Sequence, residues 1–208
     1  MKKVYWDIGV DTEQVRHLLS RLEDAQLQNQ ALKKAVAATA KQARESLASK
    51  AQESYTVKNA GFKKAMRIRT SSGRAPASII RSEGEPLPLN RFKVSRGRKA
   101  GVKAQVVKPG SLKRLERGGI KAFVNNIAAR GQVRRKDTKK GKAGSAVRHI
   151  AVAQRAGKER LEINEKFSNS IPVMLGSSER VYGIVQPHIA ADLQENLRRF
   201  VDEAMGRK

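Results

Sequence analysis

Apolar residues in the first quarter of the chain recur every three or four positions, which is the period of an α-helix. Residues 11–54 contain no Gly or Pro, and Asp11 or Thr12 can cap the start. This pattern predicts one long helix whose apolar stripe is rich in alanine. The stripe consists of Leu18, Leu22, Ala25, Leu32, Val36, Ala40, Ala43, Leu47 and Ala51.

A helix of this length cannot bury its whole stripe within a small domain, so we expect part of it to pack on another subunit. An ordinary core helix with a solvated far end is the alternative. Helical spacing returns at the C-terminus, where Pro187 is expected to kink or restart the helix. The apolar stripe of that second helix consists of Ile189, Leu193, Leu197, Phe200, Val201 and Ala204.

Between the two predicted helices, the spacing of apolar residues changes from about every four positions to every second position. A short helix is expected from Thr56 to Met66, and after it apolar and polar residues alternate in short runs separated by turns that contain Gly. Such spacing predicts an antiparallel sheet. The expected strands lie near 67–69, 77–82, 92–95, 102–106, 122–127, 147–153 and 161–163, with a hairpin loop at 96–101 and an extended segment at 85–89.

The order helix, sheet, helix predicts a single α+β domain over residues 1–208. Its expected parts are a helical N-terminal arm at 1–66, a basic β-sheet region at 67–165 and a C-terminal helical region at 166–208. Six positions on the two helical stripes are the candidates for packing between subunits. They are Leu32, Val36, Leu47, Leu193, Leu197 and Phe200.

The positive charge is concentrated in the middle of the chain. Residues 56–160 hold 29 Lys and Arg against 5 Asp and Glu, and the net charge of all 208 residues is +25. So much like charge in one fold repels itself, so this centre either faces a polyanion or is neutralised by neighbouring subunits. The candidate contact residues are Arg96, Arg98 and Lys99 in the hairpin loop, and Arg134, Arg135, Lys136, Lys139, Lys140 and Lys142 in an exposed loop.

Residues that could carry out catalysis are hard to place. His17, His149 and His188 have no second ligand at a metal-binding spacing, and there is no Cys to form a disulfide, a thiolate zinc site or a thiol nucleophile. Residues 141–145 lack the ending of a phosphate-binding loop. No apolar run reaches the length of a membrane span. We therefore expect no enzymatic activity, no cofactor, no metal and no membrane partner.

Six segments occur in a fixed order along the chain. They are the Ala-rich helix leading to 55–58, the short basic helix ending at 66–68, the proline-containing turn at 84–93, the strand at 119–124, the basic strand-turn-strand at 149–163, and 170–176 before the last helix. Together, and in this order, they resemble the minor tail protein Z family of long-tailed bacteriophages, which are tail completion proteins. The likeness covers about residues 31–205, and it departs at Lys121 and at a long lysine-rich loop at 134–146.

The resemblance implies a structural virion protein at the head-proximal end of the tail, which completes the tail and makes it competent to join a filled head. It implies a homo-oligomeric ring at the neck, expected to be hexameric, around the channel through which the DNA leaves. The implied partners are the tail terminator, the tail tube and the head-tail connector. The protein would lie in the virion, and in the host cytoplasm during assembly. The cationic centre could face genomic DNA in the channel, without sequence preference, or acidic surfaces of adjoining proteins.

A freestanding nucleic-acid-binding protein is the alternative function. Lys and Arg suit contact with phosphates, but base stacking needs exposed aromatic side chains. After the second helix the cationic centre contains only Phe92 and Phe123, both on alternating strands where a core position is expected. Tight retention on duplex DNA, together with absence from virions, would favour this alternative.

Overall fold

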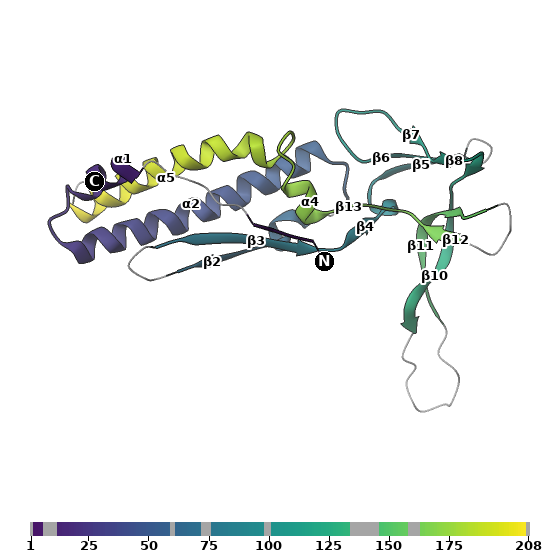
Figure 1. The fold of residues 1–208 in the computed structure, drawn as a ribbon, viewed down its shortest axis with the longest axis horizontal. Coiled ribbons are helices and arrows are strands. Elements are labelled where there is room, and N and C mark those ends of the chain that lie inside the picture. The colour runs from purple at the N-terminus through teal and green to yellow at the C-terminus, as the bar shows by residue number, and fades with distance from the viewer. Residues whose placement is uncertain are drawn as a thin grey trace, which may run out of the picture. The chain divides into compact units, whose positions relative to one another are not determined.

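The computed structural model describes residues 2–5, 12–58, 61–71, 76–97, 101–133, 146–157 and 163–206 (Figure 1). Its helices and antiparallel sheets confirm the predicted α+β class. The chain folds into two compact units, each with more contacts within itself than with the other. The helical unit consists of residues 1–55, 60–85 and 169–208, and the basic unit of 56–59 and 86–168. The three segments expected from the sequence do not coincide with these units, since the first strands and the C-terminal region belong with the N-terminal helices.

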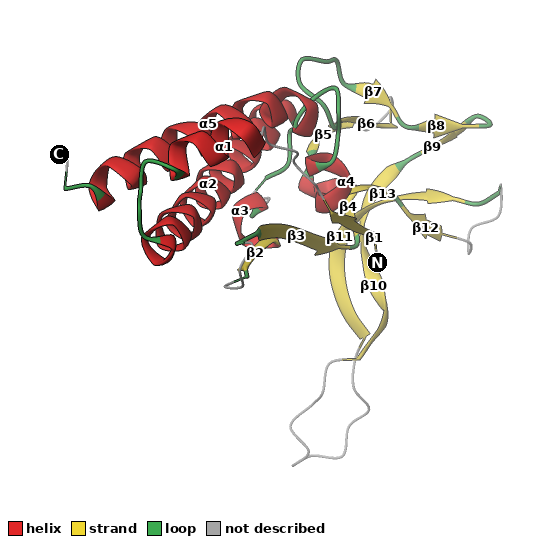
Figure 2. Cartoon of the chain, turned by 60° about the vertical axis from the view of Figure 1, so that its left-hand side comes forward, coloured by secondary structure: helices red, strands yellow, loops and turns green. Residues whose placement is uncertain are grey.

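The helical unit contains five described helices. They are α1 (Thr12–Leu19), α2 (Ala25–Ser54), α3 (Phe62–Ala65), α4 (Ile171–Leu175) and α5 (Tyr182–Ala204). Figure 2 shows α5 lying alongside α1 and α2, and α5 makes its most extensive packing with α2. A core cluster joins these helices and consists of Leu22, Ala31, Ala35, Leu197 and Val201.

The expectation of one helix over 11–54 is wrong, because the chain turns between α1 and α2. The Asp24 side chain accepts a hydrogen bond from the backbone N–H of Gln26 at 2.7 Å, and thereby caps the start of α2. The turn allows α1 to fold back and pack on α5. Leu22, in the turn itself, becomes part of the core. Burial of this leucine and of the α1 stripe therefore favours a break where propensity alone favours a continuous helix.

The alanine stripe of α2 has the helical spacing that the sequence predicts. Ala35 and Ala51 are fully buried, and Ala31 and Ala43 are nearly so. Small side chains let neighbouring backbones approach closely, and the elements that approach α2 here are α5, α3, α4, β2 and β3 of the same unit. The bulkier Leu47 is also buried. Burial of a leucine side chain stabilises the folded state by about 1.5–3 kcal/mol relative to leaving it exposed.

The sheet of the helical unit has the order β1-β3-β2 and is antiparallel throughout. Its strands are β1 (Lys2–Tyr5), β2 (Met66–Thr70) and β3 (Ser78–Gly84), and the two longer ones were expected from the sequence. Strands β2 and β3 both contact α2. Ser82 of β3 is fully buried and pairs with Val4 on one side and Met66 on the other.

The start of α5 depends on a close backbone approach at Gly183. The preceding turn is held by two hydrogen bonds to the Ser177 carbonyl, from the N–H of Val181 at 3.0 Å and from that of Tyr182 at 2.8 Å. A Cβ added to Gly183 would lie 2.9 Å from the carbonyl carbon of Ser178 and closer still to its oxygen. Helix α5 continues past Pro187 to Ala204. The close Ser178 backbone therefore leaves no room for a side chain at position 183.

We expect Gly183→Ala to lower the free energy of unfolding by about 1–3 kcal/mol, because the methyl group forces the Ser178 backbone to move. Urea denaturation followed by circular dichroism measures this change. Gly157→Ala is the matched control, since nothing lies within 4 Å of a Cβ added there. Equal stability of the two variants would show that the turn before α5 adjusts without cost.

The basic unit contains many short strands. They are β4 (Pro86–Pro88), β5 (Lys93–Gly97), β6 (Gly101–Gln105), β7 (Lys113–Arg114), β8 (Glu116–Arg117), β9 (Ile120–Lys121), β10 (Phe123–Val133), β11 (Ala146–Arg155) and β12 (Ile163–Glu165), with β13 (Phe167–Ser170) at its end and a 3₁₀ turn, η1 (Leu89–Arg91), after β4. In the described part of the chain these strands form several small sheets rather than the one central sheet expected: β5-β6-β7, β8-β9, β10-β11-β12 and β13-β4.

Phe92 occupies the core of the basic unit. It directly follows η1, its backbone N–H bonds to the Leu89 carbonyl at 3.1 Å, and its side chain is 0% exposed. The 3₁₀ turn contacts both β5 and β11. Other buried side chains of the basic unit are small or β-branched: Val102, Ala104, Ala122, Ala151, Val152 and Ala153. The core position expected for Phe92 is confirmed.

Candidate functional site

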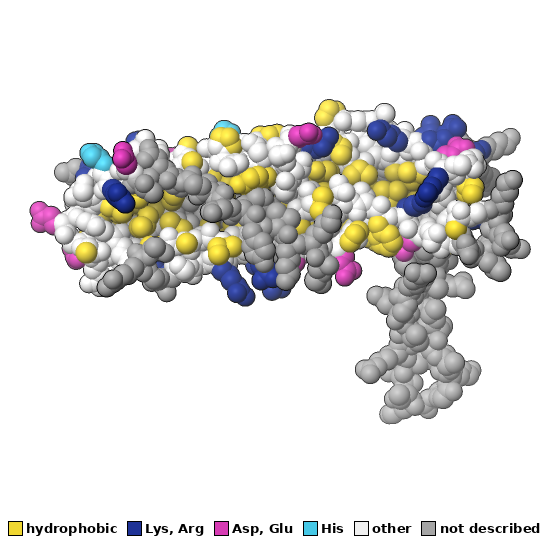
Figure 3. Space-filling model, in the orientation of Figure 1, with side chains coloured by type: hydrophobic (Ala, Val, Ile, Leu, Met, Phe, Trp, Pro, Cys, Tyr) yellow, Lys and Arg dark blue, Asp and Glu magenta, His cyan; other side chains and the backbone are white. Residues whose placement is uncertain are grey.

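The excess positive charge of the chain is concentrated in the basic unit. Its 87 residues hold 24 Lys and Arg against 5 Asp and Glu, a net charge of +19, whereas the helical unit holds 20 against 14, a net charge of +6. Figure 3 shows Lys and Arg side chains, in dark blue, on the surface over the strands labelled β7 and β8 in Figure 1. Electrostatic attraction of a negatively charged partner would therefore be strongest at the basic unit.

Three cations share one face of the β5-β6-β7 sheet. Residues directly opposite each other in an antiparallel pair point to the same side. The register places Lys93 opposite Gln105, Ser95 opposite Lys103, and Lys103 opposite Arg114. The other face carries the buried side chains of β6, so this one is the outer face. We call it the cationic face; it consists of Lys93, Ser95, Gly97, Gly101, Lys103, Gln105 and Arg114.

The cationic face places like charges side by side. Lys93 and Arg114 are exposed and Lys103 is half-buried. Directly opposed like charges destabilise a strand pair, and Lys103 stands opposite Arg114. One carboxylate approaches the face: Oε2 of Glu116 lies 4.0 Å from Nη1 of Arg114. At that distance, between partly exposed groups, the attraction is weak.

The edges of the cationic face are held by polar contacts. The backbone N–H of Lys93 donates to the Thr56 hydroxyl at 3.3 Å, and that hydroxyl donates to the Gln105 carbonyl. The Gln105 side chain in turn donates to the carbonyls of Val107 at 3.2 Å and Gly110 at 2.7 Å. These bonds hold β5 and β6 in place and secure the loop that leads to β7.

The structure places few of the cations predicted from the sequence. Arg96 is exposed on β5 but pairs with Val102, so it alternates with Lys93 rather than sharing its face. Arg98, Lys99, Arg134, Arg135, Lys136, Lys139, Lys140 and Lys142 lie outside the described residues. Sequence reasoning missed Lys93, Lys103 and Arg114. The alternation of Lys93 and Lys103 with apolar residues was the available signal for two of them.

The six helical positions predicted for subunit packing divide into two groups. Leu47 and Leu197 are buried in the chain's own core, at 2% and 0% exposure, so intrachain packing accounts for both. Leu32, Leu193 and Phe200 are half-buried against the core cluster, and Val36 is half-buried on α2. Contact of these four side chains with another subunit stays a prediction.

A buried polar contact that the sequence did not indicate joins α2 and α5. The Asn196 side chain is buried, and its Nδ2 donates to Oγ1 of Thr39 at 3.0 Å and to Oε1 of Gln42 at 2.6 Å. Sliding one helix along the other would leave the amide without partners, at a cost of about 1–3 kcal/mol. The contact therefore fixes the register of the helix pair.

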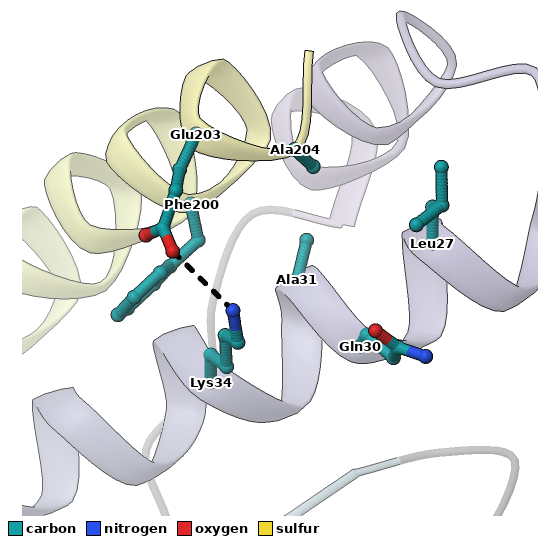
Figure 4. Close-up of a pocket in the computed structure, with 7 residues that line it drawn as sticks. All are labelled: Leu27, Gln30, Ala31, Lys34, Phe200, Glu203 and Ala204. Carbon is teal, nitrogen blue, oxygen red and sulfur yellow. Dashed lines mark hydrogen bonds and ion pairs between the residues drawn. The ribbon is translucent and has the colours of Figure 1, made fainter. Parts of the chain in front are cut away.

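A pocket of about 120 Å³ lies between α2 and the end of α5 (Figure 4). Lys34 Nζ lies 3.4 Å from Oε1 of Glu203 and 5.8 Å from the centroid of the Phe200 ring, and the Arg199 guanidinium lies 4.6 Å from the same ring. The charged groups of the pocket therefore already interact with one another. The lining residues are Leu27, Gln30, Ala31, Lys34, Phe200, Glu203 and Ala204.

An exposed ion pair ties α3 to α2. Lys63 Nζ lies 2.5 Å from Oε1 of Glu45, and this hydrogen bond, followed by the lysine's charge, lowers the pKa of the Glu45 carboxyl below its ordinary value. A carboxyl whose pKa is lower in the folded state stabilises the fold above its unfolded-state pKa. That stabilisation is lost as the pH falls through the folded-state pKa.

We therefore expect Glu45→Gln to lower the melting temperature slightly at neutral pH and to have no effect once the carboxyl is protonated in acid. Both side chains are more than half exposed, so the difference is small. Thermal melts of the two proteins across the acid range measure it. A difference that grows towards low pH would contradict the assignment of the ion pair.

Within the described ranges, no three side chains of His, Asp or Glu are grouped so that they could hold a metal ion. In the same ranges, no helix combines the length and the apolar character needed to cross a bilayer. His17 and His188 are exposed on α1 and α5.

Comparisons of the chain with protein-family models, curated proteins and solved structures found no match.

Proposed function

We propose that this protein is a structural component of a bacteriophage tail, which completes the head-proximal end of the tail and allows it to join a filled head. The observation that carries the proposal is the ordered resemblance of six segments to the minor tail protein Z family. In the fold, these segments lie in α2, at the start of β2, in β4 and η1, in β9 and β10, in β11 and β12, and in α4.

The division of charge between the two units supports the proposal. The helical unit has Lys and Arg in only small excess over Asp and Glu, and a hydrophobic core cluster packs α2 against α5. Such a unit suits an element that packs against other proteins within a particle. The basic unit, with a net charge of +19, suits a particle that contains a polyanion. A ring of identical subunits at the neck, expected to be hexameric, would bring these units together around the DNA channel. The tail terminator, tail tube and head-tail connector would be its neighbours.

Deletion of the gene from the phage that encodes this chain tests the proposal. We expect full heads and separate tails to accumulate, and expression of the chain in trans to restore joined particles. Electron microscopy counts the joined and unjoined particles, and mass spectrometry of purified virions detects the chain. Normal yields of joined, infectious particles without the chain would overturn the proposal.

A freestanding nucleic-acid-binding protein is the second candidate, and the concentration of charge in the basic unit favours it. The same virion preparations discriminate between the two functions. A chain that co-purifies with DNA from infected cells but is missing from purified virions would support the second candidate.

A further inference from the structure

We propose that the cationic face of the β5-β6-β7 sheet binds the phosphodiester backbone of duplex DNA without sequence preference. This inference rests on the proposed function only for the source of the DNA, which would be the packaged genome in the channel.

The first argument is the local arrangement of charge. Lys93, Lys103 and Arg114 extend across three adjacent strands of one sheet, with Lys103 directly opposite Arg114. Like charges in this arrangement cost the folded state stability, and the 4.0 Å approach of Glu116 offsets little of that cost. A bound polyanion would convert this repulsion into attraction.

The second argument concerns the source of the opposite charge. The helical unit carries a net charge of +6, and the basic unit one of +19. A second copy of the chain brings no net negative charge to the basic unit, because both of its units are positive overall. A polyanion such as DNA brings that charge in excess.

The third argument is the chemistry of the face itself. Between the cations lies the small residue Ser95, and the side-chain position of Gly101 faces Cβ of a further cation, Lys121, at 3.1 Å. Duplex DNA carries one negative charge per ~1.7 Å of its axis, so flexible Lys and Arg side chains find phosphates without matched geometry. Separate carboxylates on an acidic protein would each need to be placed opposite a cation.

The residues of the cationic face also indicate how it binds. None of them is aromatic, so the face offers no platform on which the bases of a single strand could stack. It lies on a sheet rather than on a helix that could enter the major groove. Contact limited to phosphates predicts binding that does not depend on sequence and weakens steeply with salt.

The test compares two triple variants of the full chain that lose the same charge. Lys93→Gln, Lys103→Gln and Arg114→Gln neutralise the cationic face, and Lys33→Gln, Lys41→Gln and Lys64→Gln neutralise three exposed lysines of the helical unit. Fluorescence anisotropy with short duplexes of two unrelated sequences measures affinity over a range of salt concentrations. Circular dichroism checks that both variants are folded.

Three phosphate contacts contribute about 2.7 to the slope of log affinity against log salt. Between about 50 and 200 mM salt, the wild-type protein should therefore lose about 40-fold more affinity than the cationic-face variant does. We expect the helical-unit variant to retain the wild-type slope and both sequences to bind alike. The proposal would be overturned if the salt slope fell equally in the two variants, or if both variants kept the wild-type slope. Binding to polyglutamate, but not to DNA, that depends on the three residues would also overturn it.

This measurement needs no virions, so its failure is distinguishable from failure of the tail assignment. A cationic face that does not bind DNA would leave a structural tail role intact. Particles that join normally without the chain would leave the DNA-binding surface intact.

Discussion

Replacing Phe92 by alanine is expected to lower the free energy of unfolding of the basic unit by about 3–5 kcal/mol. The ring is 0% exposed and lies at the junction of η1 and β5, where the 3₁₀ turn also contacts β11. Most other buried side chains of the basic unit are alanine or valine, which are too short to fill the volume that the ring leaves. The cavity therefore adds to the lost hydrophobic burial.

Urea denaturation and hydrogen exchange in β5, β6 and β11 measure this effect. Phe167→Ala is the matched control, because Phe167 is 54% exposed in the same unit and its truncation opens no cavity. We expect faster exchange in the three strands for Phe92→Ala and wild-type exchange for the control. Similar exchange in both variants would show that Phe92 does not organise the core of the basic unit.

Replacing Leu197 by aspartate is expected to destabilise the helical unit by about 4–5 kcal/mol or more, because it places a carboxylate inside a buried apolar cluster. Leu197 is 0% exposed in the cluster that joins α2 to α5. The free energy of unfolding of natural domains is only about 5–15 kcal/mol, so this single change removes a large part of it. Loss of the helical circular dichroism signal on mild heating measures the effect.

Ile184→Asp is the matched control for Leu197→Asp, because it makes a similar change on the same helix at a side chain that is 42% exposed. We expect the control to melt close to the wild-type temperature. Under the proposed function, the Leu197 variant should also yield tails that fail to join heads, whereas the control should not. A Leu197 variant that is as stable as the control would contradict burial of Leu197 in the core of its own chain. A Leu197 variant that still supports normal head-tail joining would argue against a structural role for α5.

The polar contact at Asn196 shows a limit of pattern reasoning. In the sequence, Asn196 is one polar residue next to Leu197 on an amphipathic helix, and nothing distinguishes it from solvated neighbours such as Glu195. Its burial depends on the crossing of α5 over Thr39 and Gln42 of α2, more than 150 positions away. A contact of this kind depends on the packed pair of helices and has no local signal.

The cationic face shows the same limit for function. Composition alone locates the positive charge between residues 56 and 160, and directs attention to the densest clusters. Lys93, Lys103 and Arg114 are not a cluster in the sequence, since the register of three strands brings them to one side of a sheet. Arg96, which the sequence singles out, instead alternates with Lys93 along the strand.

The sequence by itself determined the α+β class, the long alanine-rich helix, the C-terminal amphipathic helix and most of the strands, because each follows from a local period of apolar residues. Only the tertiary structure decided where the first helix breaks, how the strands divide into small sheets, and which segments belong to each unit. Those features depend on which distant surfaces bury one another. The free energy of that burial belongs to pairs of segments, and no single segment of the chain encodes it.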